Sequence, residues 1–173
     1  PWKVNESHLG AHAQLLLAAI NLGQAWGAMN DAITYLRSEA RPWFQSNVER
    51  ATDDPYIIHH VGAWKVAVDG AELIVKVAAH EMDKARETRD INNRSIAAVA
   101  VSEAKIASTE AALKISNELF QVCGTRSTRA RRNFDRHWRN IRTLTLHDPV
   151  DYKYKIVGDY ILNGTSPPIS AWT

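Results

Sequence analysis

Apolar residues recur at alternating steps of three and four along three long stretches of the chain, which is the spacing of one face of an α-helix. The first stretch covers residues 8–40, the second residues 55–87, and the third, which is rich in alanine, residues 94–122. Along the second stretch the charged side chains fall on the opposite edge, so one face is apolar and the other is solvated. The pattern therefore predicts three long amphipathic helices that pack against one another.

Local sequence signals predict where these helices begin and end. Pro42 ends the first helix, because the residue before a proline is pushed out of the α-helical region. Asp54 and Pro55 predict the start of the second helix, as an acidic cap and a proline at the first helical position. Residues 90–93 are predicted to form the next turn. Gly124 stands where a left-handed glycine ends a helix.

The C-terminal part of the chain predicts two shorter helices and a tail. The helices cover residues 133–146 and 150–162, and Pro149 separates them. The tail is predicted to be extended because its prolines are incompatible with a helix. No run with a period of two residues is joined to another by a hairpin turn, so no strand is predicted. The predicted fold class is all-α, an up-and-down helical bundle, with residues 1–173 as a single domain.

Length, charge and cysteine content narrow the classes of function. The 173 residues are enough for one well-buried domain. A net charge of +2 argues against nucleic acid as a partner, and the lack of a run of about 18 apolar residues argues against a membrane span. The single cysteine, Cys123, excludes an intrachain disulfide and indicates a reducing, cytoplasmic compartment. Because the chain starts at Pro1 and enters a helix almost at once, we expect it to be part of a longer polypeptide.

Residues 117–149 carry the densest group of ionisable side chains. Guanidinium groups bind phosphate through paired hydrogen bonds, so one interpretation is an anion site. The other is a set of structural ion pairs, with Asp135, Glu118 and the acids of the second helix as partners. Ion pairs are favoured for the helix at 133–146, and ligand binding is favoured for Arg126, which lies in a loop. The arginines of this segment are Arg126, Arg129, Arg131, Arg132, Arg136, Arg139 and Arg142.

Histidine titrates near neutral pH and is therefore a candidate for proton transfer or metal binding. His147 lies at the predicted end of the helix at 133–146. It is either a general acid or base or a structural cation stabilised by the helix dipole. His59 and His60 are adjacent in a helix and point about 100° apart, so no metal site is predicted from them.

Two short motifs lie at the end of the third predicted helix and in the helix that follows. They are Gln121-Val122-Cys123-Gly124 and Arg139-Asn140-Ile141-Arg142. Together with the order of the helices, they resemble the C-terminal helical domain of the acyl-CoA dehydrogenase superfamily. The dehydrogenases continue to a Tyr-Glu-Gly whose glutamate abstracts a proton from the substrate. This chain has His147-Asp148-Pro149 there, and aspartate is shorter than glutamate, so a dehydrogenase base at Asp148 is not expected.

Further motifs are spread over the whole chain. They are Ala40-Arg41-Pro42-Trp43, Asp54-Pro55-Tyr56, Phe134-Asp135-Arg136, Trp138-Arg139-Asn140, Leu146-His147-Asp148-Pro149-Val150 and Leu162-Asn163-Gly164. These motifs resemble the flavin-dependent monooxygenases of the dibenzothiophene monooxygenase type, over residues 8–164. The resemblance implies a homotetramer that uses O2 and reduced FMN, supplied by a separate flavin reductase, to oxygenate sulfur, nitrogen or carbon in a small-molecule substrate. FAD is the alternative cofactor.

The same resemblance implies that other domains accompany this one. Members of that branch are about 400 residues long, with an N-terminal helical domain and a central β-domain before the bundle. We therefore expect this chain to be the C-terminal part of such a flavoenzyme and to be inactive alone. Two alternatives stay open: an FAD-dependent acyl-CoA dehydrogenase or oxidase relative, and a non-catalytic helical oligomerisation module.

Individual residues also acquire roles from the resemblance. His147 matches a catalytic histidine beside the flavin ring, and Arg126 matches an arginine that reaches the FMN phosphate across a subunit interface. Arg41 matches a second phosphate contact, with Arg37 as the alternative. Relatives often carry a second histidine where this chain has Leu144, so whether the pocket is of the sulfur-oxidising type stays open. The cofactor-binding residues implied are Arg126, Arg41, Gln121 and Gly124.

Overall fold

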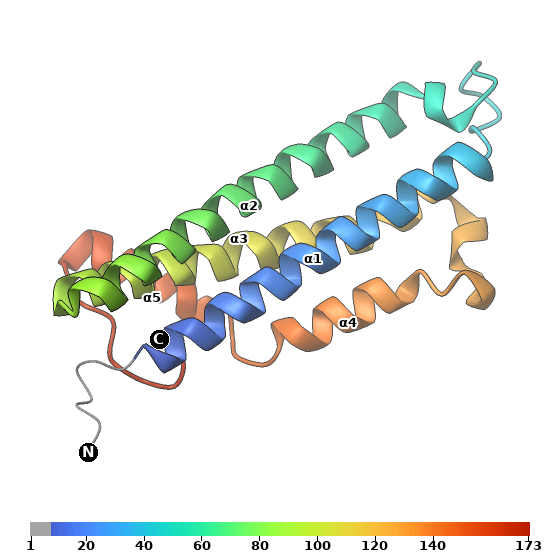
Figure 1. Ribbon diagram of the computed structural model, residues 1–173. Helices are drawn as coiled ribbons and strands as arrows, with labels where there is room; N and C mark the ends of the chain where they lie inside the picture. The colour runs from blue at the N-terminus through green and yellow to red at the C-terminus, as the bar shows by residue number, and fades with distance from the viewer. Residues whose placement is uncertain (1–7) are drawn as a thin grey trace.

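Three long helices run side by side along the length of the molecule (Figure 1). They are α1 (Leu9–Ser38), α2 (Pro55–Thr88) and α3 (Ile91–Cys123) of the computed structural model, which describes residues 8–173. The helix α3 contacts both other long helices and also the two shorter helices that follow it. Residues 8–173 contain no strand, and the predicted all-α up-and-down bundle is confirmed. Residues 1–7 of the predicted domain lie outside the described residues.

The ends of α1 and α2 agree closely with the sequence signals. The helix α1 ends at Ser38, two residues before the predicted end. The start of α2 is as predicted: the side-chain oxygen Oδ1 of Asp54 accepts a hydrogen bond from the backbone N–H of Tyr56 at 2.8 Å, and Pro55 is the first helical residue. Capping by an aspartate stabilises a helix by about 1 kcal/mol, so this start is set locally.

The predicted turn at residues 90–93 is wrong, because α3 already begins at Ile91. Asp90 caps the helix: its Oδ2 accepts hydrogen bonds from the backbone N–H groups of Asn92 and Asn93, at 3.0 and 2.9 Å. The turn is therefore confined to Arg89, which has a left-handed φ of 53°, and Asp90. At the other end of α3, Gly124 has the positive φ that the sequence predicted, 73°, but its ψ of 178° is extended rather than helical.

After α3 the chain makes two short 3-10 turns, Thr125–Thr128 and Ala130–Arg132, and enters α4 (Asp135–Thr145). The predicted start of this helix at residue 133 is wrong, because Asn133 has a left-handed φ of 52° that a right-handed helix cannot contain. The helix α4 returns along the bundle next to α1, and α5 (Asp151–Asn163) then packs against α3 (Figure 1).

The C-terminal tail folds back across the start of α1. At Gly10 an added Cβ would lie only 2.1 Å from the backbone oxygen of Ser170, so only glycine permits this approach. The tail has no regular secondary structure up to Ile169 and then makes a turn, in which Ser170 Oγ accepts a hydrogen bond from the backbone N–H of Trp172 at 3.0 Å. The tail thereby reaches the end of α4.

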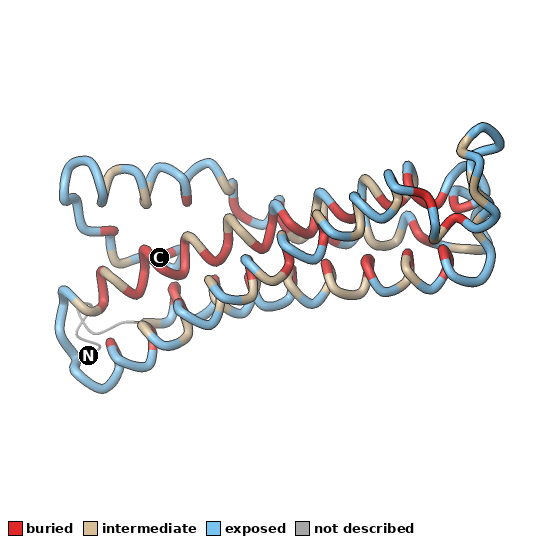
Figure 2. Tube along the Cα trace, turned by 90° about the horizontal axis from the view of Figure 1, so that it is seen from above, coloured by how far each residue is buried: buried red, intermediate tan, exposed pale blue. Residues whose placement is uncertain are grey.

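Buried residues follow the inner faces of the three long helices (Figure 2). One half of the core contains large side chains, among them Trp64, Leu119 and Phe134. The other half consists mostly of alanine together with Met82 and Val101, and such small residues allow the helices to approach closely. No helix within residues 8–173 is both long and apolar enough to cross a membrane.

Candidate functional site

His147 lies in the short connection between α4 and α5. Its backbone N–H donates to the carbonyl of Leu144 at 3.2 Å, so the hydrogen bonding of the last turn of α4 continues two residues beyond Thr145. Its side chain is 50% exposed and borders two hollows. One, of about 400 Å³, lies between α5 and the tail, and the other, of about 430 Å³, is lined by residues of α1 and the end of α4. The ring is thus held at the surface by a fixed backbone and remains accessible.

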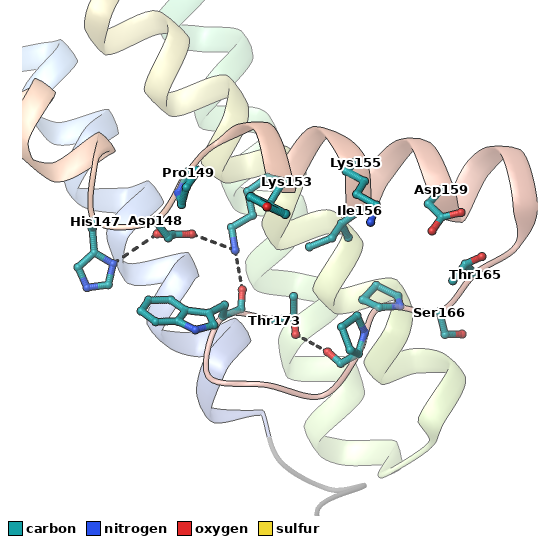
Figure 3. A pocket seen from close by; sticks show the side chains of 14 residues that line it. His147, Asp148, Pro149, Lys153, Lys155, Ile156, Asp159, Thr165, Ser166 and Thr173 are labelled. Carbon is teal, nitrogen blue, oxygen red and sulfur yellow. Dashed lines mark hydrogen bonds and ion pairs between the residues drawn. The ribbon is translucent and has the colours of Figure 1, made fainter.

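The carboxylate of Asp148 is buried beside this ring, between His147 and Lys153 (Figure 3). Its Oδ1 lies 3.4 Å from Nδ1 of His147, and its Oδ2 lies 3.1 Å from Nζ of Lys153. Burial raises the pKa of Asp148, but the hydrogen bond and charge of Lys153, together with the charge of Lys105, outweigh burial and bring the pKa below its usual value. Asp148 is therefore ionised at neutral pH.

Two lysines from different helices hold this carboxylate. Lys105, on α3, is fully buried, and its Nζ lies 3.7 Å from Oδ1 of Asp148. Burial lowers the pKa of Lys105, and the charge of Asp148 offsets part of that effect. Lys153, on α5, also donates a hydrogen bond to the carbonyl of Trp172 at 2.5 Å. The indole ring of Trp172 meets the imidazole of His147 at 61°, with the ring centroids 5.4 Å apart.

This arrangement decides what Asp148 can do. The expectation that it is not a dehydrogenase base agrees with its position, because its side chain is only 9% exposed and its charge is taken up by lysines. A base that abstracts a proton must reach the substrate. Of the two side chains, only His147 is open enough to do so.

The predicted cofactor-binding turn lies at the other end of α4 from His147 (Figure 1). Gln121 is exposed at the end of α3, with Nε2 3.4 Å from Nε2 of His60. Gly124 is exposed at the cap, and Arg126 is exposed in the following 3-10 turn. Within residues 8–173, Arg126 has no carboxylate within ion-pair distance. Arg41 is exposed in the loop after α1.

These residues are at the same end of the bundle as one another. An ion pair between Glu39 and Arg132 joins the end of α1 to the second 3-10 turn. Arg41 follows that end of α1, so the structure brings Arg41 and the Gly124–Arg126 turn to one end and leaves His147 apart from them.

The arginines of α4 mostly form ion pairs, as the sequence favoured. Arg136 pairs with Asp31, and Arg139 Nε lies 2.9 Å from Asp135 Oδ2. The expected partners in α2 and Glu118 are wrong. Glu118 instead accepts hydrogen bonds from Trp64 and Lys114 at 2.8 and 2.5 Å. The partners of Arg132 and Arg136 come from α1 because α4 packs on α1 rather than on α2.

Other reactive groups add no second centre within residues 8–173. No cluster of three or more histidine, cysteine, aspartate or glutamate side chains could hold a metal ion there. His60 is near Glu118, with 3.5 Å between Nδ1 and Oε2, and its ring lies beside the buried Trp64. Burial raises the pKa of Cys123 to about 12, so this residue stays a protonated thiol.

The sequence did not reveal Lys105, Lys153 or Trp172 as parts of the His147 site. Lys105 lies next to Ile106, one of the apolar residues that recur every seven positions along α3 (Val99, Ile106, Leu113 and Phe120). A charge beside this apolar row was the only available signal. Lys153 and Trp172 carry no local signal, because their role depends on how the tail crosses the bundle.

The chain is similar to known proteins over almost its whole length. Residues 15–152 match the family described as "Acyl-CoA dehydrogenase, C-terminal domain". A probable FMNH2-dependent monooxygenase, SfnC, of Pseudomonas putida is 40% identical over 93% of this chain and 42% of its own length. A dibenzothiophene monooxygenase of Rhodococcus erythropolis is 43% identical over 90% of this chain and 38% of its own length.

A solved structure of FMN-bound TdsC from Paenibacillus sp. A11-2 superposes with a TM-score of 0.90 at 34% identity, over 95% of this chain and 42% of that one. The chain thus spans about two fifths of the curated relatives it matches, 42% and 38% of their lengths.

Proposed function

Because the chain belongs to the acyl-CoA dehydrogenase C-terminal domain family, we propose that it is the C-terminal helical domain of an FMNH2-dependent monooxygenase. The substrate proposed is a small organic sulfur or nitrogen compound. The relatives described above support this choice, since one is named an FMNH2-dependent monooxygenase, another acts on dibenzothiophene, and a third binds FMN. The chain is proposed to be the C-terminal part of a longer, cytoplasmic flavoenzyme that receives its reduced flavin from a separate reductase.

One observation carries the choice of a monooxygenase over an acyl-CoA dehydrogenase or oxidase relative. Asp148, at the position of the dehydrogenase base, is buried and ion-paired with two lysines. The accessible proton-transfer group next to it is His147. A domain built for α-proton abstraction needs the opposite arrangement, with the carboxylate open to the substrate.

The residues of this chain fit a flavin phosphate. Arg126 is an exposed guanidinium after a glycine turn, and Arg41 is exposed at the same end of the bundle. Both are available for charged hydrogen bonds to phosphate oxygens. When bound, reduced FMN supplies the electrons that activate O2. The contribution of His147 is to give or take a proton at its accessible ring edge.

The separation between these groups supports a homotetramer in which subunits share sites. The helix α4 has 11 residues, so its ends are about 16 Å apart. We propose that Arg126 and His147 of one chain serve different flavins, at sites that are shared between subunits. An exposed apolar strip on α2 supplies a surface for a second copy. It comprises Val66, Leu73 and Val77, with exposures of 74%, 64% and 57%.

The test is to express the longer polypeptide that contains this chain and supply it with a flavin reductase, FMN, NADH and 18O2. Sulfides, sulfinates and amines are the substrates to offer. We expect one 18O atom in the product, with the other leaving as water and FMNH2 oxidised to FMN. Consumption of FMNH2 with only hydrogen peroxide formed across these substrates would contradict the proposal.

The same preparation separates the alternatives. Formation of an enoyl product from an acyl-CoA would identify a dehydrogenase or oxidase. Flavin that neither binds nor is consumed would identify an oligomerisation module.

A further inference from the structure

The imidazole of His147 has one polar contact within residues 8–173, and that contact is Asp148. The distance from Nδ1 to Oδ1 is 3.4 Å. No other described side chain offers a donor or acceptor to the ring, and its second nitrogen, Nε2, is left unpaired there. Whether Asp148 is ionised therefore decides whether its contact requires a proton on Nδ1 of the ring.

An ionised carboxylate can accept hydrogen bonds but cannot donate them. With Asp148 ionised, the contact exists only if Nδ1 carries a proton, and the lone pair of the neutral ring is then on Nε2. We propose that Asp148 is a positioning residue that fixes the proton of His147 on Nδ1 and so presents a basic Nε2 to the reaction. This inference rests on the proposed function, in which His147 is the acid–base group.

Lysines keep the carboxylate in this role. Lys153 on α5 reaches Oδ2 at 3.1 Å, and Lys105 on α3 reaches Oδ1 at 3.7 Å. Both lysines are almost fully buried. A carboxylate between two buried cations is held ionised and cannot turn toward solvent without leaving both charges unpaired.

The tail holds the other side of the ring. Trp172 packs against the imidazole, and its carbonyl is tied down by Lys153. Arg94 of α3, which is buried, donates hydrogen bonds to the carbonyls of Thr173 and Pro167 at 2.7 and 3.4 Å. Lys153 therefore connects the two groups that orient His147, the carboxylate and the indole.

The free edge of the ring can serve the hollow between α1 and α4. That hollow is lined by His147 together with the polar residues Gln24, Asn140 and Thr143 and with apolar side chains. The side-chain oxygen of Gln24 is buried and has no hydrogen-bond partner within the described residues. His147 is the titratable side chain that lines this hollow, where a basic Nε2 suits a substrate or intermediate that carries a transferable proton.

The first test replaces the carboxylate by an amide of the same shape, Asp148→Asn, in the full-length polypeptide. We expect the kcat for oxygenated product to fall about tenfold or more, as part of the roughly hundredfold or larger contribution of a positioned acid–base group, with little change in KM. Asp83→Asn is the matched control. It makes the same chemical change at an exposed residue of α2 that lines neither hollow beside His147, and its kcat should stay within about twofold.

A double-mutant cycle separates positioning from folding. In a His147→Ala background, Asp148→Asn should change product formation by less than about twofold, because its effect passes through the missing ring. The charge-matched variant Lys105→Met with Asp148→Asn removes one positive and one negative charge, and it should show the same loss of kcat. Wild-type kcat in Asp148→Asn, or an equal further loss without His147, would overturn the proposal.

Solid-state NMR of the full-length polypeptide labelled with 15N-histidine gives a readout that needs no substrate. His147, identified by the signal lost in His147→Gln, should have a protonated Nδ1 and a bare Nε2, and Asp148→Asn should shift the ring toward the other tautomer. The opposite tautomer in the wild type would overturn the proposal. Absence of oxygenation with the expected tautomer would overturn the proposed function instead.

Discussion

The two ends of α4 use charge in opposite ways. At the C-terminal end, around His147, three charged side chains are buried together: Lys105 on α3, Lys153 on α5, and Asp148 in the connection between α4 and α5, whose carboxylate pairs with both lysines. At the N-terminal end, Arg126 is exposed after a glycine turn and has no acidic partner within residues 8–173. In the first region the charged groups pair with one another within the chain. In the second, the guanidinium group of Arg126 is available to bind an anionic ligand.

Burial therefore distinguishes two kinds of charged residue in this domain. A buried network costs desolvation and survives only if every member is paired, so its members act on their neighbours. An exposed arginine costs little and is free to bind an anion. We therefore propose that the first region orients the reacting group and that the second binds the cofactor.

The largest effect is expected from removing His147 itself. His147→Ala should lower the formation of oxygenated product by about 10²- to 10⁴-fold, the usual contribution of a general acid–base residue. The unfolding midpoint should hardly change, because the side chain is half exposed. The measurement is product formed per FMNH2 oxidised, with the urea unfolding midpoint measured alongside. Undiminished product would show that the buried network serves stability alone.

Breaking the network should instead destabilise the fold. Lys153→Met removes the nearest partner of Asp148 and the donor to the carbonyl of Trp172, and it should lower the free energy of unfolding by about 3–5 kcal/mol, as is typical when one partner of a buried ion pair is lost. Urea titration followed by circular dichroism measures it. Lys155→Met is the control, since Lys155 is exposed on the same helix and should cost less than about 0.5 kcal/mol.

Acid should weaken the same network. The pKa of Asp148 is held below its usual value in the folded protein, so its contribution is fully present above the ordinary aspartate pKa and is lost as the pH falls through the lower, folded value. Unfolding free energy measured from neutral to acid pH should therefore decline, and Asp148→Asn should flatten part of that decline. An unchanged pH slope in the variant would mean that the pKa of Asp148 is the same in the folded and unfolded chain, so that the lysines do not lower it.

The contrast also explains how far the sequence alone could go. The helices were predictable because burial of one face imposes a repeat of three and four, as along α2. The two wrong helix starts, at Asp90 and Asn133, depend on a single cap and a single left-handed residue. The position of such a helix start depends on a few hydrogen bonds, which produce no repeating pattern in the sequence.

For the site, His147 could be named because a titratable histidine at a helix end is visible in the sequence and the family resemblance chose between its two interpretations. Its supports could not, because Lys105 and Trp172 approach from distant segments and only the packing of α3 and the tail brings them together. The partner of Arg136 was missed for the same reason: Asp31 lies across the contact between α1 and α4.

Loss of the exposed Arg126 should weaken FMN binding and leave the stability of the fold unchanged. Arg126→Ala should reduce the binding free energy of FMN to the full-length protein by about 1.5–3 kcal/mol, the value of a charged hydrogen bond. Equilibrium dialysis or flavin fluorescence measures this change. Its unfolding midpoint should match the wild type, because no described residue depends on the side chain. Wild-type affinity would mean that the phosphate is bound elsewhere.

The smallest effect is expected at Arg139, which separates the two kinds of arginine. It pairs with Asp135 one turn earlier on α4, and both side chains are more than half exposed, at 58% and 59%. Such pairs contribute about 0.3–0.5 kcal/mol, so Arg139→Ala should lower the unfolding free energy by no more than that, and 1 M salt should abolish the difference. FMN affinity should not change. If Arg139→Ala weakened FMN binding as much as Arg126→Ala, the anion-binding surface would extend along α4. The arginines of α4 would then not differ from Arg126 in function.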